Sequence, residues 1–597
     1  MSGHVWENDK SGASDLAQPI LPELAARRRR SRTVPPVRQV IDARVHINQV
    51  GFLPGEPKRA VISATGAIVG NSFTVVDDDV TPQPRYTGKL QAYAGPNGAK
   101  YGHYDRHFFA DFGELQRPGR YRLRLSDGHL SPPFSIGSDV YSRLVPLVLK
   151  YFDVQCCGTQ KSAHRGDCHV DDGVIVGGPR DGERIDASGG WHDAGDYMKF
   201  VETTSYVTAV MLFAYDHYRR QFPAHGPSGA MPQLLAYARV GLDWLLKMHP
   251  SPQEFYYQVG DATDHDTWRL PEEDCAAHRN TWEPRPVYSG VGANLAGRTA
   301  VALAIASRLY RPYARQYADR CLASAQTAYR LGLDNRKALT TNPSDFYPEQ
   351  TWADDMEWAA ATLYRATGRQ EYLQQALEFS IEAGPANDQT SVYNTHALAH
   401  YTLFPYASPA HRQLLLDHLR SDAELTRHRA ENPYCLGTPY IWGTAEAAAG
   451  AAITSLIYAK LSGEKEYVDL ARCQRDFILG CNPFGLSCVI GAGTRYPLFP
   501  HHQVANIRNI ELSGALVGGP ASVGIFQQQK ISLEGVEFST QTEGPVLAQD
   551  LPDEIGVYHD AVQDFVTNEP ANDYTAKFLL LTAFYIAPED ALHKRVT

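Results

Sequence analysis

The feature that most constrains this fold is the long run of helical periodicity that follows Ser138. Apolar residues recur at i, i+3, i+4 and i+7 from there to about residue 588, with few strand signals. Twelve helix candidates follow from this spacing, and they begin near residues 140, 203, 231, 294, 311, 354, 370, 390, 409, 443, 465 and 571. The predicted class is therefore mainly α.

Twelve helices joined by alternating short and long connections predict six hairpins that close into a toroid, with the long loops at one end. An open helical solenoid is the alternative, although the chain lacks the fixed sequence period that solenoid arrays repeat. Gly, Pro, Trp and carboxylate residues concentrate in the loops at 158–200, 250–292, 339–353 and 481–570. We expect functional sites there, because loops carry most binding and catalytic groups.

A different pattern precedes the helical run. Short alternating stretches such as Val45–Asn48 and Tyr121–Leu125 are separated by Gly, Pro and Asp turns, which predicts a small β-sandwich. A chain of 597 residues also exceeds the usual size of a single core. The predicted organisation is a mobile tail over residues 1–40, a β-sandwich domain over 41–137 and a helical domain over 138–590.

Composition argues against two classes of partner. No run approaches the roughly 18 apolar residues of a membrane span, so no membrane partner is expected. The formal charge of −11 is spread along the chain, whereas nucleic acid would favour a basic face. The basic run Arg27–Arg30 is followed by Thr33–Arg38 and not by the apolar segment of a secretory signal. No export signal is recognisable, so the sequence as written indicates the cytoplasm; oligomeric state stays unknown.

Three carboxylates form the first candidate site. Asp193 and Asp196 stand three residues apart in the Gly-rich segment Gly189–Tyr197, where both can face one point. Such a pair is more often an Asx-turn, a helix cap or a set of calcium ligands. Glu569 precedes the last helix candidate, where an acid that stabilises the helix start is the simpler interpretation. Together, however, they supply the water-activating carboxylate and the proton-donating carboxyl that glycosidic cleavage requires.

Four segments resemble glycoside hydrolase family 9. Gly189–Asp196 resembles its catalytic-base motif, and Val45–Pro54 resembles the immunoglobulin-like domain that precedes many bacterial members. Asn482–Ser487 through His502, and Asp560–Glu569, resemble its two C-terminal signatures. The resemblance implies an (α/α)6 barrel after an all-β immunoglobulin-like sandwich, and inverting hydrolysis of β-1,4-linked glucan polysaccharides or oligosaccharides. It also implies action outside the cell by analogy, which leaves localisation unknown.

The resemblance assigns roles by position. It implies that Asp196 is the general base, that Asp193 helps to hold the attacking water, and that Glu569 is the general acid. His501 matches a substrate-contacting histidine. The acid role requires a raised pKa at Glu569, while both aspartates are expected to stay ionised.

Aromatic side chains and two departures bear on the substrate. Tyr558, Trp352 and Trp268 are candidate stacking platforms for sugar rings, with core packing as the alternative role of each. The family's usual His-x-Arg ends here in Gln503, which lacks the planar charged fork of arginine. The family's Asn-Ala after the acid is here Thr575-Ala576, a milder change.

Two other functions stay open. An exo-acting β-glucosaminidase on chitosan oligosaccharides would fit Gln503. A non-catalytic carbohydrate-binding protein is the second alternative, but such a protein would be expected to lose at least one of the three carboxylates, and all three are present.

Cysteines and histidines predict a metal site beside the first motif. Cys157, Cys168, His169 and His192 match the ligands of a closed tetrahedral structural zinc site, and the resemblance implies similar ligands in bacterial members. Their spacing is not that of a zinc finger, and buried thiols with core histidines are the alternative. Cys156 is the alternative to Cys157.

Calcium is a second expected ion, because family members often bind it. The loop with Asp261, Asp264 and Asp266 and the pair Asp354-Asp355 are candidate positions. Scattered carboxylates do not define a hard-cation site, so the calcium ligands stay unknown.

Overall fold

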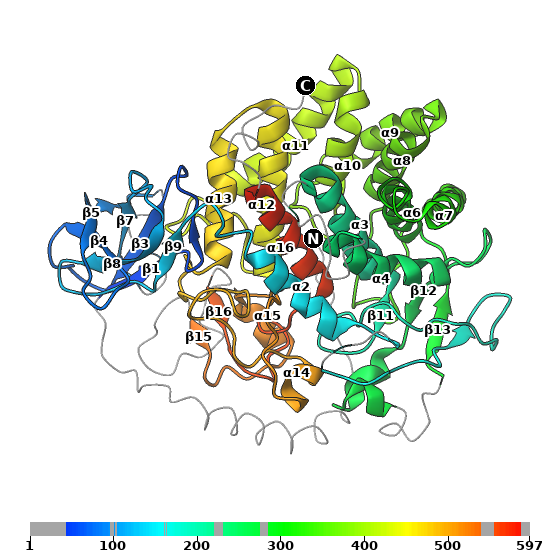
Figure 1. Ribbon diagram of the computed structural model, residues 1–597, viewed down its shortest axis with the longest axis horizontal. Coiled ribbons are helices and arrows are strands. Elements are labelled where there is room, and N and C mark those ends of the chain that lie inside the picture. The colour runs from blue at the N-terminus through cyan, green and yellow to red at the C-terminus, as the bar shows by residue number, and fades with distance from the viewer. Residues whose placement is uncertain are drawn as a thin grey trace.

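The computed structural model describes residues 43–95, 101, 104–159, 162, 164–219, 222, 231–274, 284–538 and 555–586. The predicted tail over residues 1–40 lies outside this part of the chain. A β-rich unit, at the left of Figure 1, is followed by a larger helical unit. The mainly α class and the preceding β-sandwich are confirmed.

The β-rich unit consists of two sheets. One sheet has the order β1 (Ala43–His46), β3 (Arg59–Ala64), β7 (Arg106–Asp111), β6 (Gln91–Ala92), and the other has the order β2 (Gly51–Phe52), β9 (Phe134–Ile136), β8 (Gly119–Leu125), β4 (Ser72–Asp77), β5 (Pro84–Lys89). In β8 buried Tyr121, Leu123 and Leu125 alternate with more exposed residues, which is the two-residue period that the sequence shows. These side chains belong to a core of their own, separate from that of the helices.

An inner ring of helices closes on itself. Among the described residues the inner helices are α3 (Val201–Tyr218), α6 (Ala293–Leu309), α8 (Ala353–Thr367), α10 (His396–Leu403), α12 (Thr444–Ser462) and α16 (Asn572–Ile586). Each contacts the next in this order, and α16 contacts α3. The closed ring excludes the open solenoid. Since these helices are buried on almost every side, apolar and small residues occur on all their faces, with a few buried charged residues such as Arg298 and Asp355 among them.

An outer ring covers the inner one. It consists of α2 (Leu144–Gln155), α4 (Gln233–Met248), α7 (Arg315–Asp334), α9 (Gln370–Ala383), α11 (Pro409–Arg429) and α13 (Glu466–Ile478). Outer and inner helices alternate along the chain, and each outer helix buries one face against an inner neighbour. All the predicted helices are present in the described part, with the largest offset at α10, expected near 390 and observed at His396.

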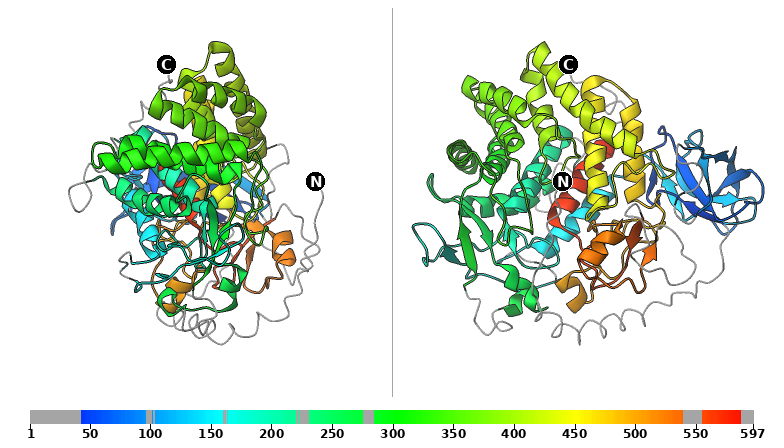
Figure 2. Two further views of the ribbon diagram at one scale, coloured as in Figure 1. Left: turned by 90° about the vertical axis from the view of Figure 1, so that its right-hand side faces the viewer. Right: turned by 180° about the vertical axis from the view of Figure 1, so that it is seen from behind.

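The long connections gather at one end of the barrel, at the bottom of Figures 1 and 2. They contain short strands and helices that the sequence did not predict: β10 (Val174–Val176), β11 (Lys199–Phe200), β12 (Tyr256–Val259), β13 (Pro286–Ser289), η2 (Ala262–Asp266), η3 (Pro271–Glu273), α14 (Gln503–Ile507), β14 (Ala521–Ser522), α15 (Val523–Gln528), β15 (Glu537–Phe538) and β16 (Gly556–Tyr558). These elements hold too few residues to show a sequence period, so the sequence could not predict them. Tertiary contacts determine their conformation.

Buried polar contacts tie the β-sandwich to the barrel at α13. Arg475 Nη1 lies 2.8 Å from Glu56 Oε2, and Asn48 Nδ2 donates to Asp476 Oδ1 at 2.7 Å. Gln49 Nε2 donates to the carbonyl of Gly485 at 2.8 Å. The segment that resembles the start of the family's leading domain therefore supplies the joint between the two units.

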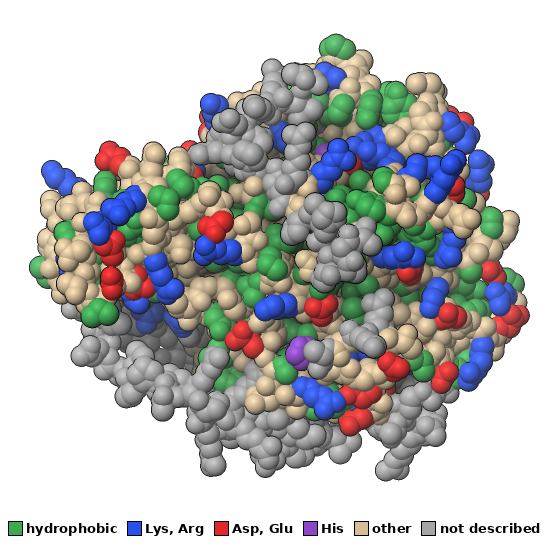
Figure 3. Space-filling model, viewed as in Figure 1, with side chains coloured by type: hydrophobic (Ala, Val, Ile, Leu, Met, Phe, Trp, Pro, Cys, Tyr) green, Lys and Arg blue, Asp and Glu red, His purple; other side chains and the backbone are tan. Residues whose placement is uncertain are grey.

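The surface carries both signs of charge. On the face in Figure 3, Lys and Arg are interspersed with Asp and Glu over the helices and the β-sandwich. Within the described residues, no helix has the length and apolar character needed to cross a membrane.

Candidate active site

Three segments far apart in the sequence meet at Gly195. Its N–H donates to Glu569 Oε1 at 3.0 Å, and its carbonyl accepts from the N–H of Gln503 at 3.0 Å. A Cβ here would lie 2.5 Å from the carbonyl oxygen of His501 and 2.8 Å from Glu569 Oε1, so a larger residue would drive the segments apart. The structure thus brings the base motif and both C-terminal signatures together.

Asp193 is buried and fixed on both sides. Thr203 Oγ1 donates to its Oδ1, and the hydroxyl of Tyr347 donates to its Oδ2 at 2.5 Å. Burial and then the charge of Asp196 raise the pKa of Asp193 well above its usual range, against these two donors. The cause is that the side chain is only 3% exposed and lies beside a second carboxylate. The ionised state expected for Asp193 stays a prediction.

Asp196 lies beside a cation that the sequence analysis missed. His265 Nε2 lies 3.1 Å from Asp196 Oδ2, and the N–H of Met198 donates to Oδ1 at 3.1 Å. Partial burial works against charge on His265, whose side chain is 43% exposed, but the hydrogen bond to Asp196 and the surrounding carboxylates outweigh it and raise its pKa to about 9. His265 therefore places a positive charge beside the carboxylate of the candidate general base.

Glu569 has the opposite character. Burial and the neighbouring charge of Asp196 raise the pKa of Glu569 to about 8, while the Gly195 N–H opposes the shift. The raised pKa expected for the acid is confirmed. Its backbone is held by the N–H of Gly518, which donates to its carbonyl at 3.0 Å. Two segments thus meet here: one contributes a carboxyl group with a raised pKa, and the other contributes Asp196 with its imidazole neighbour His265.

A fourth carboxylate, Asp573, was also missed. It lies in the first turn of α16, four residues after Glu569, and burial raises its pKa to about 7. Its charge contributes to the raised pKa of Asp193. The only sequence feature that could have pointed to Asp573 is its position shortly after Glu569, the predicted acid.

The predicted aromatic platforms differ in exposure. Trp268 is half-buried with its ring 5.0 Å from that of His501, and His501 Nδ1 lies 2.6 Å from the carbonyl oxygen of Val562. Tyr558 is 2% exposed with its hydroxyl donating to Asn568 at 2.6 Å, so its surroundings fit the core-packing alternative. Trp352 is half-buried, packs on the barrel core and precedes α8.

An unpredicted aromatic extends the row that begins at Trp268. Phe565 lies 5.9 Å from the ring of His501, and Trp442 lies 5.7 Å from Phe565. Trp442 is 41% exposed, which leaves much of its face available. The rings are edge-on or tilted to one another, so Trp442 is the additional candidate for stacking on a sugar ring.

Gln503 is held inside the protein. It is 2% exposed, and its Oε1 accepts the N–H of Arg269 at 3.1 Å. Its side chain therefore ties two loops together.

The four predicted metal ligands converge. Ligand atoms of Cys157, Cys168, His169 and His192 lie within 4.8 Å of one another, and all four residues are buried. A tetrahedral zinc ion requires ligand atoms roughly 3.4 to 3.8 Å apart. Two of the four sulfur-to-nitrogen distances are 3.7 and 3.9 Å, and the two imidazole nitrogens are 3.2 Å apart. These spacings lie in or close to that range, so the donor set fits such an ion after small shifts.

Neighbouring groups orient and charge these ligands. Asp274 Oδ2 lies 2.7 Å from His169 Nε2, and Lys199 Nζ lies 3.5 Å from Cys157 Sγ. Burial opposes ionisation of Cys157, but the bond from Cys168 and the Lys199 charge lower its pKa well below its usual range. Cys156 instead directs its thiol to the carbonyl of Phe152 at 3.2 Å, which leaves Cys157 as the ligand.

The candidate calcium carboxylates have protein partners. Asp264 pairs with Arg269 at 2.6 Å, and Asp354 accepts the N–H of Thr395 at 2.7 Å. Asp355 lies 3.5 Å from Arg298. Calcium binding stays a prediction.

Comparison with known proteins agrees with this geometry. The chain is similar to a cellodextrinase from Butyrivibrio fibrisolvens, 27% identical over 82% of this chain and 93% of the relative. It is similar to endoglucanase D from Acetivibrio thermocellus, 28% identical over 80% of this chain and 78% of the relative.

Two solved structures are similar in sequence and fold. A metagenome-derived glycoside hydrolase family 9 endoglucanase superimposes with a TM-score of 0.76 at 28% identity, over 92% of this chain and 99% of the other. A Zn-binding triple mutant of the family 9 endoglucanase J30 gives a TM-score of 0.72 at 26% identity, over 89% of this chain and 99% of the other.

The family models cover most of the described chain. The model of the cellulase N-terminal ig-like domain matches residues 41–129. The model of glycosyl hydrolase family 9 matches residues 141–582, which include Asp193, Asp196, Glu569 and the four candidate metal ligands. The chain therefore belongs to glycosyl hydrolase family 9 and is a glycoside hydrolase whose (α/α)6 barrel follows an immunoglobulin-like domain.

Proposed function

We propose that this enzyme hydrolyses β-1,4-glucosidic bonds in cello-oligosaccharides or cellulose-type glucans with inversion at the anomeric carbon. The observation that carries the proposal is the meeting of the carboxyl groups at Gly195: Glu569, whose pKa burial raises to about 8, accepts the N–H of Gly195, and the next residue, Asp196, lies 3.1 Å from His265. The relatives named cellodextrinase and endoglucanase support the substrate class. We assign the sandwich to residues 41–137 and the catalytic domain to 138–590.

In the proposed mechanism Asp196 removes a proton from a water molecule as the water attacks the anomeric carbon. Asp193, fixed by Thr203 and Tyr347, holds that water in place. Glu569 gives its proton to the glycosidic oxygen as the bond breaks. Asp196 ends protonated and Glu569 ionised, and exchange with solvent restores both.

We infer that the Cys157, Cys168, His169 and His192 cluster holds zinc in a structural role. Four protein ligands close a tetrahedral site and leave no position for water. The contribution of these residues is to fix the loop that contains Asp193, because His192 directly precedes it.

Product stereochemistry tests the mechanism. The parent enzyme and cellopentaose are followed by NMR from the first turnovers, and the α anomer should form first from the β-linked substrate. An initial β anomer would contradict the roles of Asp196 and Glu569, because a retaining enzyme uses the second carboxylate as a nucleophile.

A second substrate remains a candidate because of Gln503. Where the family usually has an arginine, Gln503 carries no positive charge that would repel a cationic amino sugar. Hydrolysis rates measured at equal concentrations of cello-oligosaccharides and glucosamine oligosaccharides distinguish the two substrate classes. Preferred cleavage of the glucosamine series from one end would replace the glucan proposal with an exo-β-glucosaminidase.

A further inference from the structure

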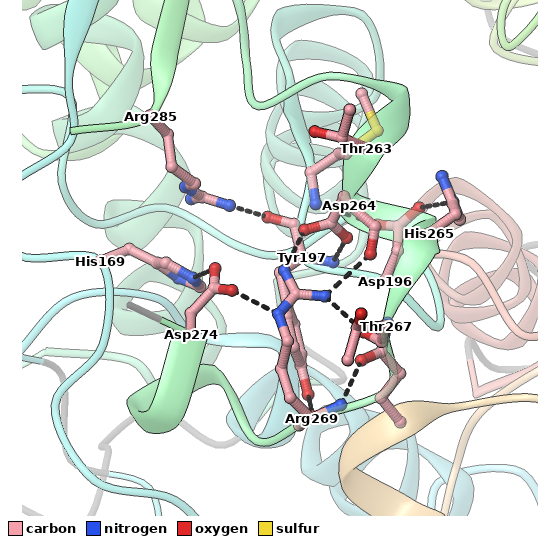
Figure 4. Close-up of polar contacts among 12 residues, drawn as sticks. His169, Asp196, Tyr197, Thr263, Asp264, His265, Thr267, Arg269, Asp274 and Arg285 are labelled. Carbon is pink, nitrogen blue, oxygen red and sulfur yellow. Dashed lines mark hydrogen bonds and ion pairs between the residues drawn. The ribbon is translucent and has the colours of Figure 1, made fainter. Parts of the chain in front are cut away.

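One buried arginine bridges two carboxylates between the metal cluster and the catalytic base (Figure 4). The side chain of Arg269 is 2% exposed. Its Nε donates to Asp274, and its Nη2 donates to Asp264 Oδ1 at 2.6 Å. Its Nη1 donates to the carbonyls of Asp264 and Thr267, each at 2.8 Å. All three nitrogens of the guanidinium are therefore engaged.

On one side, this bridge reaches the metal cluster. Asp274 Oδ2 lies 2.7 Å from His169 Nε2, while His169 Nδ1 faces Cys157 Sγ at 3.7 Å. A carboxylate on the outer nitrogen of a histidine fixes which nitrogen is available as the ligand and how the ring is oriented. Arg269 holds Asp274 in the position where it does this.

On the other side, the bridge reaches the base. Asp264 Oδ2 accepts the N–H of Tyr197 at 2.8 Å, and Tyr197 directly follows Asp196. His265, the neighbour of Asp264, contacts the carboxylate of Asp196 at 3.1 Å. The backbone beside the base and the imidazole on its carboxylate thus depend on the same short helix, η2.

Tyr197 contacts both ends of this bridge. Its hydroxyl donates to the carbonyl of Arg269 at 2.5 Å, and the guanidinium lies 5.0 Å from its ring centroid. The same ring packs on the two metal-site imidazoles, 4.9 Å from His192 and 5.8 Å from His169. A shift of the histidines is therefore transmitted to the residue that follows Asp196.

We propose that Arg269 is a positioning residue that couples the Cys/His metal cluster to the catalytic base Asp196. The inference rests on the proposed roles of Asp196 and the cluster. It differs from a general structural role because it predicts reciprocity: the metal orders the base loop through Arg269, and Arg269 retards loss of the metal.

The test combines removal of the metal with two variants of the bridge. Arg269→Lys keeps the charge but cannot span both carboxylates with a planar fork. Asp274→Asn removes the charge that faces His169 and leaves the Asp264 contacts in place. Arg508→Lys is the control, because Arg508, whose side chain is 44% exposed, pairs with Glu272 outside this bridge.

Two readouts need no substrate. Zinc release into a chromogenic chelator should be roughly 10- to 100-fold faster in both variants than in the parent, as for other partners of metal ligands. Hydrogen exchange of the peptide 193–200 should accelerate at least about tenfold when the parent loses zinc. In Arg269→Lys that peptide should exchange fast with or without zinc, and Arg508→Lys should match the parent in both.

Activity supplies the third readout. With zinc bound, Arg269→Lys should lose roughly 10- to 100-fold in kcat with KM within about twofold, because a displaced base weakens the chemical step and not substrate binding. Removal of zinc should then lower the kcat of Arg269→Lys by a much smaller factor than it lowers the kcat of the parent.

Three results would overturn the inference. The first is unchanged exchange of the peptide 193–200 when the parent loses zinc. The second is zinc release from Arg269→Lys at the parent rate. The third is an additive effect of zinc removal and the substitution. Hydrogen exchange and zinc release are measured without substrate, so they test the coupling separately from hydrolysis. The coupling can be absent from an enzyme that hydrolyses glucans, and it can be present in an enzyme that does not.

Discussion

Glu569 is the residue on which bond cleavage depends most directly. Glu569→Gln keeps the shape of the side chain and removes its proton, so turnover of an unactivated cello-oligosaccharide should fall by roughly 100- to 10,000-fold. An aryl glycoside with a good leaving group needs less protonation and should lose far less. Similar losses on both substrates, or near-parental turnover of the oligosaccharide, would show that Glu569 is not the acid.

The same residue predicts a pH dependence. Because the pKa of Glu569 is raised to about 8, its acid form decreases about tenfold for each pH unit above that value. A plot of kcat/KM against pH should therefore fall on its alkaline side near pH 8, as a value belonging to the coupled carboxylates together. With the activated aryl glycoside this alkaline decline should weaken or vanish. A decline that is identical for both substrates would assign the ionisation to another group.

Some residues of the site could be predicted from the sequence and others could not. Asp193, Asp196 and Glu569 could be predicted because the resemblance to the family extends over the whole segments that contain them. His265 is a histidine in an acidic loop until the fold places it 3.1 Å from Asp196. The raised pKa of Asp193 likewise depends on burial, which no local pattern encodes.

At the scale of elements, the loop before α3 joins the metal cluster to the catalytic carboxylates. Cys168→Ser removes one ligand, so the protein should purify with less than about a tenth of an equivalent of zinc. Loosening the loop by about 1 Å should then lower kcat by roughly 100-fold. Metal analysis, the melting temperature and kcat should all decrease together.

The control for this change is Cys156→Ser, next to a ligand but outside the cluster. Its hydroxyl can still donate to the carbonyl of Phe152, as the thiol does at 3.2 Å. This variant should keep zinc, stability and activity. Zinc at parental levels in Cys168→Ser would remove the cluster from the account.

The helices were predictable and the site-bearing elements were not. Outer helices such as α7 alternate buried and exposed residues with the helical period, and this period defines them in the sequence. The strands β10 to β13 and the helix η2 have two to five residues each and are shaped by contacts such as that of Arg269 with Asp264. The order of the elements was thus available from sequence, whereas the coupling between their loops was not.

At the scale of the whole molecule, the ion pair Arg475–Glu56 joins the two domains. Arg475→Met would leave Glu56 and Asp476 buried without their cation, which should cost about 3 to 5 kcal/mol in the free energy of unfolding. The denaturant midpoint should decrease accordingly. Since the joint lies at α13, kcat should be unchanged where the protein is folded.

An exposed pair gives the matched control. Arg143 pairs with Asp139, and their side chains are 69% and 54% exposed, so Arg143→Ala should change stability by less than about 1 kcal/mol. Equal midpoints for the two variants would mean that the interdomain pair contributes no more than a surface one.

The closing of the inner ring by α16 has a consequence for how the protein is made. On the ribosome, α3 emerges roughly 370 residues before α16, a delay of about 20 to 70 seconds at ordinary elongation rates. Throughout this interval the ring lacks its last helix, and Glu569, just ahead of α16, has not yet joined the base. We therefore expect a nascent chain to be inactive and prone to aggregate until α16 emerges, so that a chaperone that holds unfolded chains is most useful late in synthesis.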